Sequence, residues 1–222
     1  MGTPHISLLL GVNSKTNGSA VCEMGCTKVL VLVDGPKQLL QKEESAKGKI
    51  NCSIFLTNFS TPQHKDNPKR QMKMRDFAQV IKDTFESVVM LELYAMSQID
   101  IHIIVLQNDG AYKSAAINAT TLALVDAGIY MKDLLVSTTA GFIEGVCCLD
   151  LLYSEEKKEG CCAMIAYAPG KGMLAHVDVI SPKMSTILLT SSIETAIEGC
   201  KTLHATMKSY IKEYMSTHYH SA

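Results

Sequence analysis

One short stretch of the sequence combines a polar turn with a nearby cation. Asn108, Asp109 and Gly110 end an apolar run, and Lys113 follows at the start of a segment of small residues. Asn and Asp hydrogen-bond their own backbone and Gly tolerates positive φ, so the chain can turn sharply here and begin a helix. The N–H groups of a helix N-terminus attract anions. The stretch therefore predicts either a phosphate site beside Lys113 or an ordinary strand-to-helix connection.

A second group of cations opens another predicted helix. Lys69, Arg70, Lys73 and Arg75 fall within seven residues. Cations are unfavourable at a helix N-terminus because the helix macrodipole is positive there. The cluster therefore indicates either that an anion binds there or that this is simply a solvated helix surface.

The eight cysteines lack the spacing of a metal site. The pairs at positions 147–148 and 161–162 are adjacent, so the two thiols of each pair would lie on opposite faces of a strand. Cys22 and Cys26 have no matching Cys or His pair downstream. We therefore expect reduced thiols in the core, with no metal and no cofactor.

Hydrophobic periodicity predicts the elements that position these residues. Alternating apolar residues predict the strands Ile6–Val12, Ala20–Met24, Lys28–Val33, Lys49–Leu56, Ile99–Leu106, Leu134–Ile143, Val146–Leu152, Cys161–Ala168 and Met173–Ile180. Apolar residues at spacings of three and four predict the helices Lys69–Leu93, about Ser114 to Ala127, and about Ser192 to Tyr214. This order predicts an α+β fold with helices packed on mixed sheets.

Turn residues and polar segments predict the connections. Asp34-Gly35-Pro36 should end the third strand, and Glu144-Gly145 should form a two-residue hairpin. The charged segment 153–160 should be a surface loop.

The composition is that of a folded chain with balanced charge. Of 222 residues, 47% are hydrophobic, which is ample for a core. Lysine and arginine number 21 and aspartate and glutamate 22, so the overall charge indicates no nucleic-acid or membrane partner, and RNA contacts must come from a local basic cluster. No apolar run reaches the roughly 18 residues of a membrane span. We expect one domain over residues 1–222, with 215–222 as a frayed tail.

A set of spaced motifs resembles the RNase PH family. These motifs are Gly18-Ser19-Ala20, Thr27-Lys28-Val29, Gly35-Pro36, Ser97 to Asp100, Gln107 to Gly110, Ile117-Asn118-Ala119 and Ala123 to Ile129. The resemblance runs from Ile6 to the C-terminal helix. It implies the RNase PH fold (ribosomal protein S5 domain 2-like), with mixed sheets, packed helices and a βαβ core.

The resemblance also implies a chemistry that can be checked residue by residue. Active members use inorganic phosphate to cleave the 3′ end of RNA, which requires cations to hold phosphate and an acid to protonate the leaving oxygen or hold a metal. Where they carry Gly-Ser/Thr-Arg after the turn, this sequence has Ala111-Tyr112-Lys113. An arginine of the first long helix aligns with Lys73, and the catalytic aspartate aligns with Cys162.

Three positions that carry the chemistry thus differ here. Loss of the acid alone should cost on the order of 10²–10⁴ in rate. The resemblance therefore implies a non-catalytic core subunit of the RNA exosome, forming part of its hexameric RNase PH-like ring and RNA channel. In that role basic side chains would contact the phosphates of single-stranded RNA, and the candidates are Lys69, Arg70, Lys73, Arg75 and Lys113.

The same resemblance implies partners and locations. The partners are the other RNase PH-like exosome subunits, the S1/KH cap subunits, the catalytic exosome nucleases and single-stranded RNA. The locations are the nucleus, nucleolus and cytoplasm. Family members carry an N-terminal arm with an Asp-Gly-Arg motif that this sequence lacks, so we expect a reduced interface with neighbouring subunits.

Two other functions stay open from the residues alone. Lys73 and Lys113 could substitute for two arginines in an active phosphate-dependent 3′-to-5′ exoribonuclease. The chain could also be a nucleotide or small-molecule binder that has kept the fold, because a fold alone does not fix a function.

Overall fold

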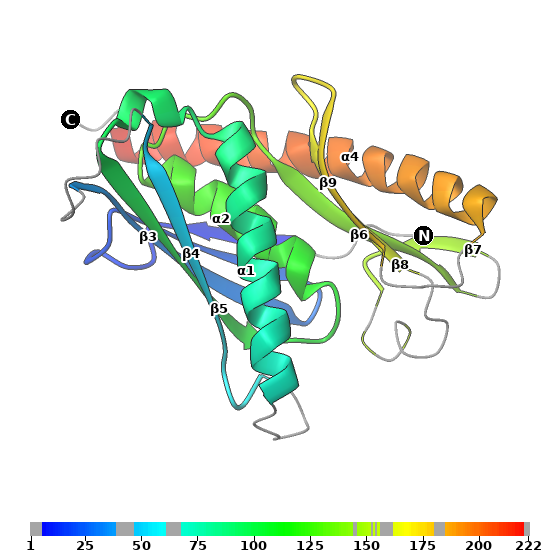
Figure 1. Cartoon of the computed structure of the whole chain (residues 1–222). Helices are drawn as coiled ribbons and strands as arrows, with labels where there is room; N and C mark the ends of the chain where they lie inside the picture. The colour runs from blue at the N-terminus through cyan, green and yellow to red at the C-terminus, as the bar shows by residue number, and fades with distance from the viewer. Residues whose placement is uncertain are drawn as a thin grey trace.

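A computed structural model describes residues 6–38, 47–60, 68–143, 146–151, 153, 155, 162–179 and 185–219. The described chain forms two β-sheets, and Figure 1 shows them side by side, with the long C-terminal helix α4 (Thr186–Tyr219) running behind both. Together they form an α+β arrangement of mixed sheets and packed helices, as the order of elements in the sequence predicted.

The N-terminal sheet has five strands in the order β1-β2-β3-β5-β4. Their bounds are β1 Ile6–Leu10, β2 Gly18–Met24, β3 Thr27–Gln38, β4 Lys49–Leu56 and β5 Ser97–Gln107. Neighbouring strands are antiparallel except β4 and β5, which are parallel and joined through helix α1 (Pro68–Val88). This pair and α1 form a βαβ unit, which the family resemblance implied.

Apolar residues alternate along β5 because one face of the strand is buried, as the sequence predicted. Ile99, Ile101, Ile103 and Val105 are fully buried, while the residues between them are partly exposed. One face of the strand therefore belongs to the core, as a period of two requires.

The C-terminal sheet has four antiparallel strands in the order β7-β6-β8-β9. Their bounds are β6 Val136–Ile143, β7 Val146–Leu149, β8 Cys162–Ala168 and β9 Met173–Val179. The predicted turn at Glu144-Gly145 lies outside the described residues, but Ile143 pairs with Val146 across it. Most of the predicted loop 153–160 also lies outside the described residues.

Helix α2 (Tyr112–Asp126) lies at the centre of the fold and is buried on every side from Ser114 to Leu124. Its small residues permit this close packing. Its one buried amide, Asn118, is paired with the backbone of β6: Nδ2 donates to Ser137 O (2.8 Å) and Oδ1 accepts from Ser137 N (2.7 Å). The pair fixes α2 to the C-terminal sheet without leaving the amide unsatisfied.

The prediction that β3 ends at Asp34-Gly35-Pro36 is wrong. β3 continues to Gln38, and a register shift against β5 between Asp34 and Lys37 accommodates the extra residues. Only a glycine fits at position 35, because its φ is +144° and an added Cβ would lie 2.8 Å from Gln98 O.

Both long helices also differ from their predicted bounds. α1 ends at Val88 rather than Leu93, because Val88 O accepts from Lys132 N (2.8 Å) and Met90 N donates to Tyr130 O (3.0 Å), and a short 3₁₀ turn follows at Leu91–Tyr94.

α4 is longer than predicted at both ends. It begins at Thr186, where Ser185 Oγ accepts from Leu188 N (3.4 Å) as an N-cap. It includes 215–219 of the predicted frayed tail, and the Tyr214 and His218 rings stack at 4.2 Å. At about 1.5 Å per residue, its 34 residues span roughly 50 Å, which is enough to reach both sheets.

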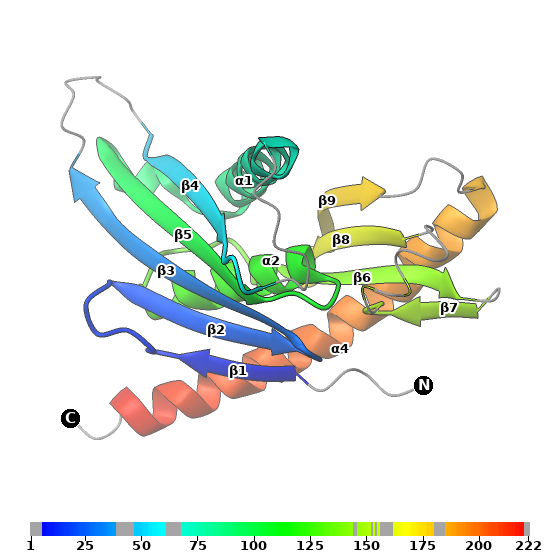
Figure 2. The same ribbon diagram turned by 90° about the horizontal axis from the view of Figure 1, so that it is seen from below.

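One face of the N-terminal sheet carries no described helix. Figure 2 shows this face, with α2 and α4 behind the strands and α1 seen end on beside β4. Apolar side chains form one row across all five strands through consecutive paired positions: Leu9, Val21, Leu30, Ile104 and Phe55. Leu9 is 47% exposed and Phe55 58% exposed. We call these five residues the apolar row.

Among the described helices, none combines the length and apolar composition needed to cross a bilayer.

Candidate functional site

The predicted polar turn lies immediately before α2. Asn108 Oδ1 accepts from Gly110 N (3.1 Å), as the sequence predicted for an Asx turn. Thr27 of the neighbouring hairpin fixes the turn, since its hydroxyl donates to Gly110 O (2.6 Å) and accepts from Asp109 N (3.0 Å). The structure thus confirms the turn and adds a tertiary support that local pattern did not indicate.

Ala111 separates the turn, which ends at Gly110, from the first residue of α2, Tyr112. Ala111 has φ +51°, a left-handed conformation that alanine rarely adopts, and its methyl side chain provides no capping hydrogen bond. In the first turn of α2, the Tyr112 ring contacts Phe77 of helix α1. The Lys113 ammonium contacts Phe77 and also Asp178 of strand β9.

Lys113 forms an ion pair within the chain. Its Nζ lies 2.6 Å from Asp178 Oδ2 and 5.3 Å from the centre of the Phe77 ring. Phe77 is buried and meets the Tyr112 ring edge to face at 6.1 Å. The ammonium predicted to face phosphate is therefore already balanced by a carboxylate and placed over an aromatic ring.

Cys162 is a buried thiol on β8, with 1% of its surface exposed. It pairs with Gly141 of β6, and Met164, two residues on, pairs with Asp178. Paired residues, and residues two apart on a strand, share a face. Cys162 and Asp178 therefore lie on the same face of the C-terminal sheet.

The third position singled out from the sequence is on α1. Lys73 is exposed and lies one helical turn before Phe77, which contacts both Tyr112 and Lys113. Ser114 Oγ and Thr139 Oγ1, 2.6 Å apart, hold the start of α2 against β6. The structure thus brings the three positions predicted from the sequence, Lys73, Lys113 and Cys162, to one region around the start of α2.

The sequence reasoning missed Asp178. The only local signal was that His176 and Asp178 occupy alternate positions of an otherwise apolar strand. Burial lowers the pKa of His176, an effect that the Asp178 carboxylate opposes and the Lys113 ammonium adds to. The imidazole is therefore neutral near pH 7.

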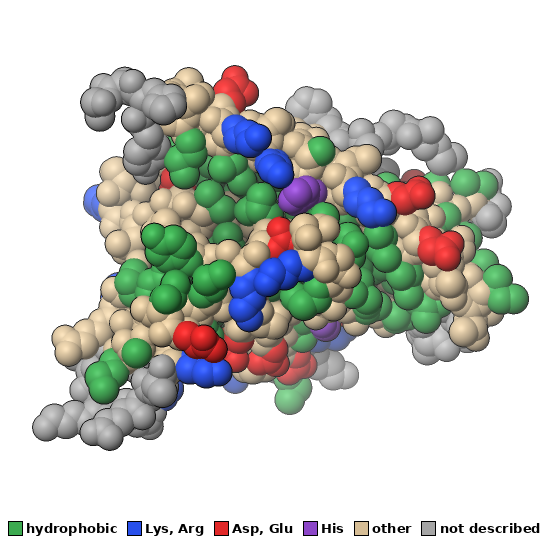
Figure 3. Space-filling view, turned by 90° about the horizontal axis from the view of Figure 1, so that it is seen from above, with side chains coloured by type: hydrophobic (Ala, Val, Ile, Leu, Met, Phe, Trp, Pro, Cys, Tyr) green, Lys and Arg blue, Asp and Glu red, His purple; other side chains and the backbone are tan. Residues whose placement is uncertain are grey.

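The basic cluster on α1 does not form one surface. Lys73 lies four residues after position 69 and three after Arg70, so it shares a side of the helix with both, whereas Arg75 is two, five and six residues away from Lys73, Arg70 and position 69. Arg70 is partly buried and Lys73 and Arg75 are exposed; the Lys69 side chain lies outside the described part of the structure. Figure 3 draws a different side, away from the N-terminal end of α1, and on that side the Lys and Arg side chains also lie as separate spots.

The described cysteines are all free thiols. Burial raises the pKa of Cys22 and of Cys52 to about 12 and that of Cys200 to about 11, so these thiols carry no charge at neutral pH. In the part of the chain that the structure describes, no three His, Cys, Asp or Glu side chains gather as a metal site would need.

Comparison with known proteins places these features in a family context. The RNase PH family model, described as the 3′ exoribonuclease family, domain 1, matches residues 5–130. The exosome complex component RRP41 homolog of Arabidopsis thaliana is 38% identical over 212 residues, covering 92% of this chain and 85% of that protein. The exosome complex component ski6 of Schizosaccharomyces pombe is 34% identical over 206 residues, covering 92% and 84%.

Solved structures share the fold. The crystal structure of rice Rrp46 has a TM-score of 0.80 at 24% identity and covers 95% of this chain and 96% of its own. The Archaeoglobus fulgidus exosome with RNA bound to its active site has a TM-score of 0.78 at 18% identity, covering 92% and 88%.

Proposed function

We propose, from the premise that this chain belongs to the 3′ exoribonuclease family of RNase PH type, that it is a non-catalytic core subunit of the RNA exosome. In this proposal it forms part of the ring of RNase PH-like subunits and of the RNA channel through that ring. Its relatives are named as components of the exosome complex, and one related structure contains RNA.

The observation that carries the proposal is the surroundings of Lys113 and Cys162. Phosphorolysis needs a cation that is available to hold phosphate and an acid that can donate a proton to the leaving oxygen. Lys113 is paired with Asp178 at 2.6 Å, and Cys162, which the sequence resemblance aligns with the catalytic aspartate of active members, is a buried thiol. Neither residue supplies what the reaction requires.

The apolar row supports membership of an assembly. Its five residues lie on the sheet face without a described helix; Leu9 and Phe55 at the two ends are about half exposed, Leu30 and Ile104 are partly exposed, and Val21 is buried. Apolar surface of this kind is typical of a protein interface. We infer that a neighbouring RNase PH-like subunit covers this face, and that S1/KH cap subunits and catalytic nucleases dock elsewhere on the ring, in nucleus, nucleolus and cytoplasm.

RNA would pass the side of α1 that carries Lys69, Arg70 and Lys73. Phosphate contacts of this kind position a strand without reading its sequence. The matched cation Arg75 lies on another side of the helix and is the natural control.

One observation favours a second candidate, an active phosphorolytic subunit. Asp178 supplies a carboxylate on the same sheet face as Cys162, so it could act as the acid in place of the lost aspartate. In this alternative Lys113 would orient Asp178, and Lys73 would hold phosphate.

The experiment that separates the two candidates is phosphate-dependent degradation of single-stranded RNA by the chain assembled with its RNase PH-like neighbours. The proposal predicts no release of nucleoside diphosphates above that of the partners alone. Cys162→Asp tests whether the acid alone is missing. Activity in the parent chain that Asp178→Asn abolishes would establish the enzyme instead.

A further inference from the structure

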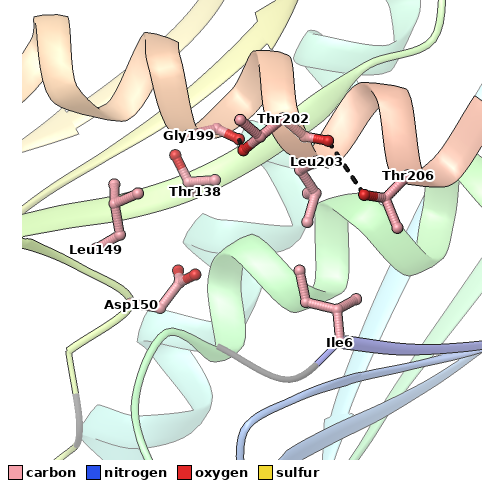
Figure 4. A pocket seen from close by; sticks show the side chains of 8 residues that line it. All are labelled: Ile6, Thr138, Leu149, Asp150, Gly199, Thr202, Leu203 and Thr206. Atoms are coloured by element: carbon pink, nitrogen blue, oxygen red, sulfur yellow. Dashed lines mark hydrogen bonds between the residues drawn. The ribbon is translucent and has the colours of Figure 1, made fainter. Parts of the chain in front are cut away.

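A pocket of about 230 Å³ opens between α4 and the two sheets. Figure 4 shows the carboxyl group of Asp150 and the side chain of Ile6 both directed from below toward α4, with Thr138 on the wall and Thr202, Leu203 and Thr206 above. None of the family positions discussed above lines it. The pocket is therefore separate from the region around Lys113 and Cys162.

The hydroxyl groups of the pocket present acceptors and no free donors. Thr138 Oγ1 donates to Ala196 O (3.0 Å), Thr202 Oγ1 to Gly199 O (2.8 Å) and Thr206 Oγ1 to Thr202 O (3.2 Å). A hydroxyl has a single hydrogen and two lone pairs. With its hydrogen directed to a helix carbonyl, each threonine offers only lone pairs to a ligand.

Asp150 adds a carboxylate to these acceptors. Its backbone N–H donates to Thr139 O (2.7 Å) and its Oδ1 accepts from Thr139 N (3.3 Å), so the residue is held at both ends. It has φ +51°, a conformation that an ordinary L residue adopts at a cost. Among the described residues no cation pairs with it. Its carboxylate adds to the effect of burial in raising the pKa of the Cys22 and Cys200 thiols.

We propose that this pocket binds an aliphatic cation, a primary ammonium or a guanidinium on a hydrocarbon stem. Such a group donates several hydrogen bonds and carries a positive charge, which would pair with the carboxylate of Asp150. Ile6 and Leu203 form the apolar part of the wall and would contact the stem. This inference is independent of whether the chain degrades RNA.

The site has a defined pH dependence. Burial raises the pKa of Asp150 to about 6, while the neighbouring Cys22 and Cys200 stay neutral. A cation binds the ionised carboxylate, so affinity should be full above about pH 7 and should fall about tenfold for each pH unit below about 5.

The test is calorimetric titration of the full chain at pH 7.5 with agmatine, 1,4-diaminobutane and tetramethylammonium as separate probes. Tetramethylammonium carries the charge but has no N–H donor. We expect agmatine or diaminobutane to saturate one site, and Asp150→Asn to weaken that binding at least tenfold. Thr202→Val, a milder change, should weaken it about three- to tenfold by removing one acceptor.

Asp83→Asn is the control, because Asp83 is exposed on α1 and the substitution removes the same charge. It should leave binding unchanged. The proposal is overturned if no probe binds at millimolar concentration, if tetramethylammonium binds as well as agmatine, or if Asp83→Asn weakens binding as much as Asp150→Asn. Thermal unfolding of each variant establishes that it is folded before its binding is compared.

The two sources of such a cation can be separated with one further probe. N-acetyl-arginine amide presents the guanidinium as a side chain within a polypeptide, whereas agmatine presents it on a free amine. Tighter binding of the amide would assign the pocket to an arginine of a partner protein. Tighter binding of agmatine or diaminobutane would assign it to a free amine.

Discussion

Lys113 Nζ lies 2.6 Å from Asp178 Oδ2, which joins the first turn of α2 to the last strand of the C-terminal sheet. Both side chains are about one-quarter to one-third exposed. Asp178 therefore balances the charge of the ammonium that a phosphate would otherwise contact. The pair lies at the N-terminal end of α2, which is the end of a helix that attracts anions.

Removing the carboxylate should release that cation. We expect Asp178→Asn to raise the affinity for single-stranded RNA about two- to fivefold at low salt, with a steeper dependence on salt because one more phosphate contact forms. Stability should fall by only about 1 kcal/mol, since the pair is partly exposed. Fluorescence anisotropy between 50 and 200 mM salt measures the slope. Unchanged binding in Asp178→Asn, compared with Asp83→Asn, would mean that Lys113 does not face RNA.

The two sides of α1 should respond differently to loss of charge. Lys73→Ala should weaken RNA binding by the assembled ring about three- to tenfold, because each lost phosphate contact also removes one released counterion. Arg75→Ala removes the same charge from another side of the helix and should change binding less than twofold. Equal effects of the two substitutions would indicate general electrostatic attraction rather than a contact.

The apolar row should act in assembly and not in the stability of the chain. Phe55→Ser exposes no core, since Phe55 is 58% exposed, so we expect the unfolding midpoint to change little. Co-purification with the RNase PH-like neighbours should fall severalfold. Leu93→Ser, at a residue 61% exposed outside this face, is the matched control. Retained co-purification in Phe55→Ser would place the interface elsewhere.

Asn118 should be one of the most sensitive positions in the core. Asn118→Ala removes both hydrogen bonds to Ser137 and leaves two buried backbone groups unpaired, which should cost about 2–4 kcal/mol of unfolding free energy. Urea denaturation followed by circular dichroism measures this. Ser209→Ala, at an exposed position of α4, should change the free energy by less than about 0.5 kcal/mol.

Asp150 should give the chain an unusual pH profile. Its pKa rises from 3.8 to about 6 on folding, so between these values the folded chain binds more protons than the unfolded chain. Stability from this group is therefore present below about pH 4 and is lost as the pH rises to about 6 and above. Asn cannot ionise and tolerates positive φ.

Asp150→Asn should therefore match the parent chain at pH 4 and exceed it by about 1–2 kcal/mol at pH 7.5, after allowance for partial solvent screening. Urea unfolding at both pH values gives this difference directly. A constant difference across the range would mean that the carboxyl group titrates normally.

The sequence predicted those features that depend on neighbouring residues. The strand Lys49–Leu56 has its predicted bounds, and the turn at Asn108 and the buried stripe of α1 follow from local periodicity. The early start of α4 was missed because residues 186–191 include β-branched and hydroxyl side chains with weak helix propensity, and only the cap at Ser185 marks the start.

Pairing between distant positions could not be predicted in the same way. Lys113 and Asp178 are 65 residues apart, and their contact depends on the register of β8 with β9 and on the packing of α2. The sequence identified Lys113 and Cys162 through resemblance, but no local signal indicated which carboxylate would lie beside them. The environment of Asp150 likewise arises from α4, β6 and the first strand together.

The apolar row also has a consequence for how the cell keeps the protein. A copy made in excess of its neighbours would leave Leu9 and Phe55 in water, and such surface is what quality-control chaperones and proteases recognise. Binding of neighbours stabilises the chain by mass action. The abundance of this subunit should therefore follow the supply of its neighbours rather than its own rate of synthesis, so that overexpression alone would raise turnover more than steady-state amount.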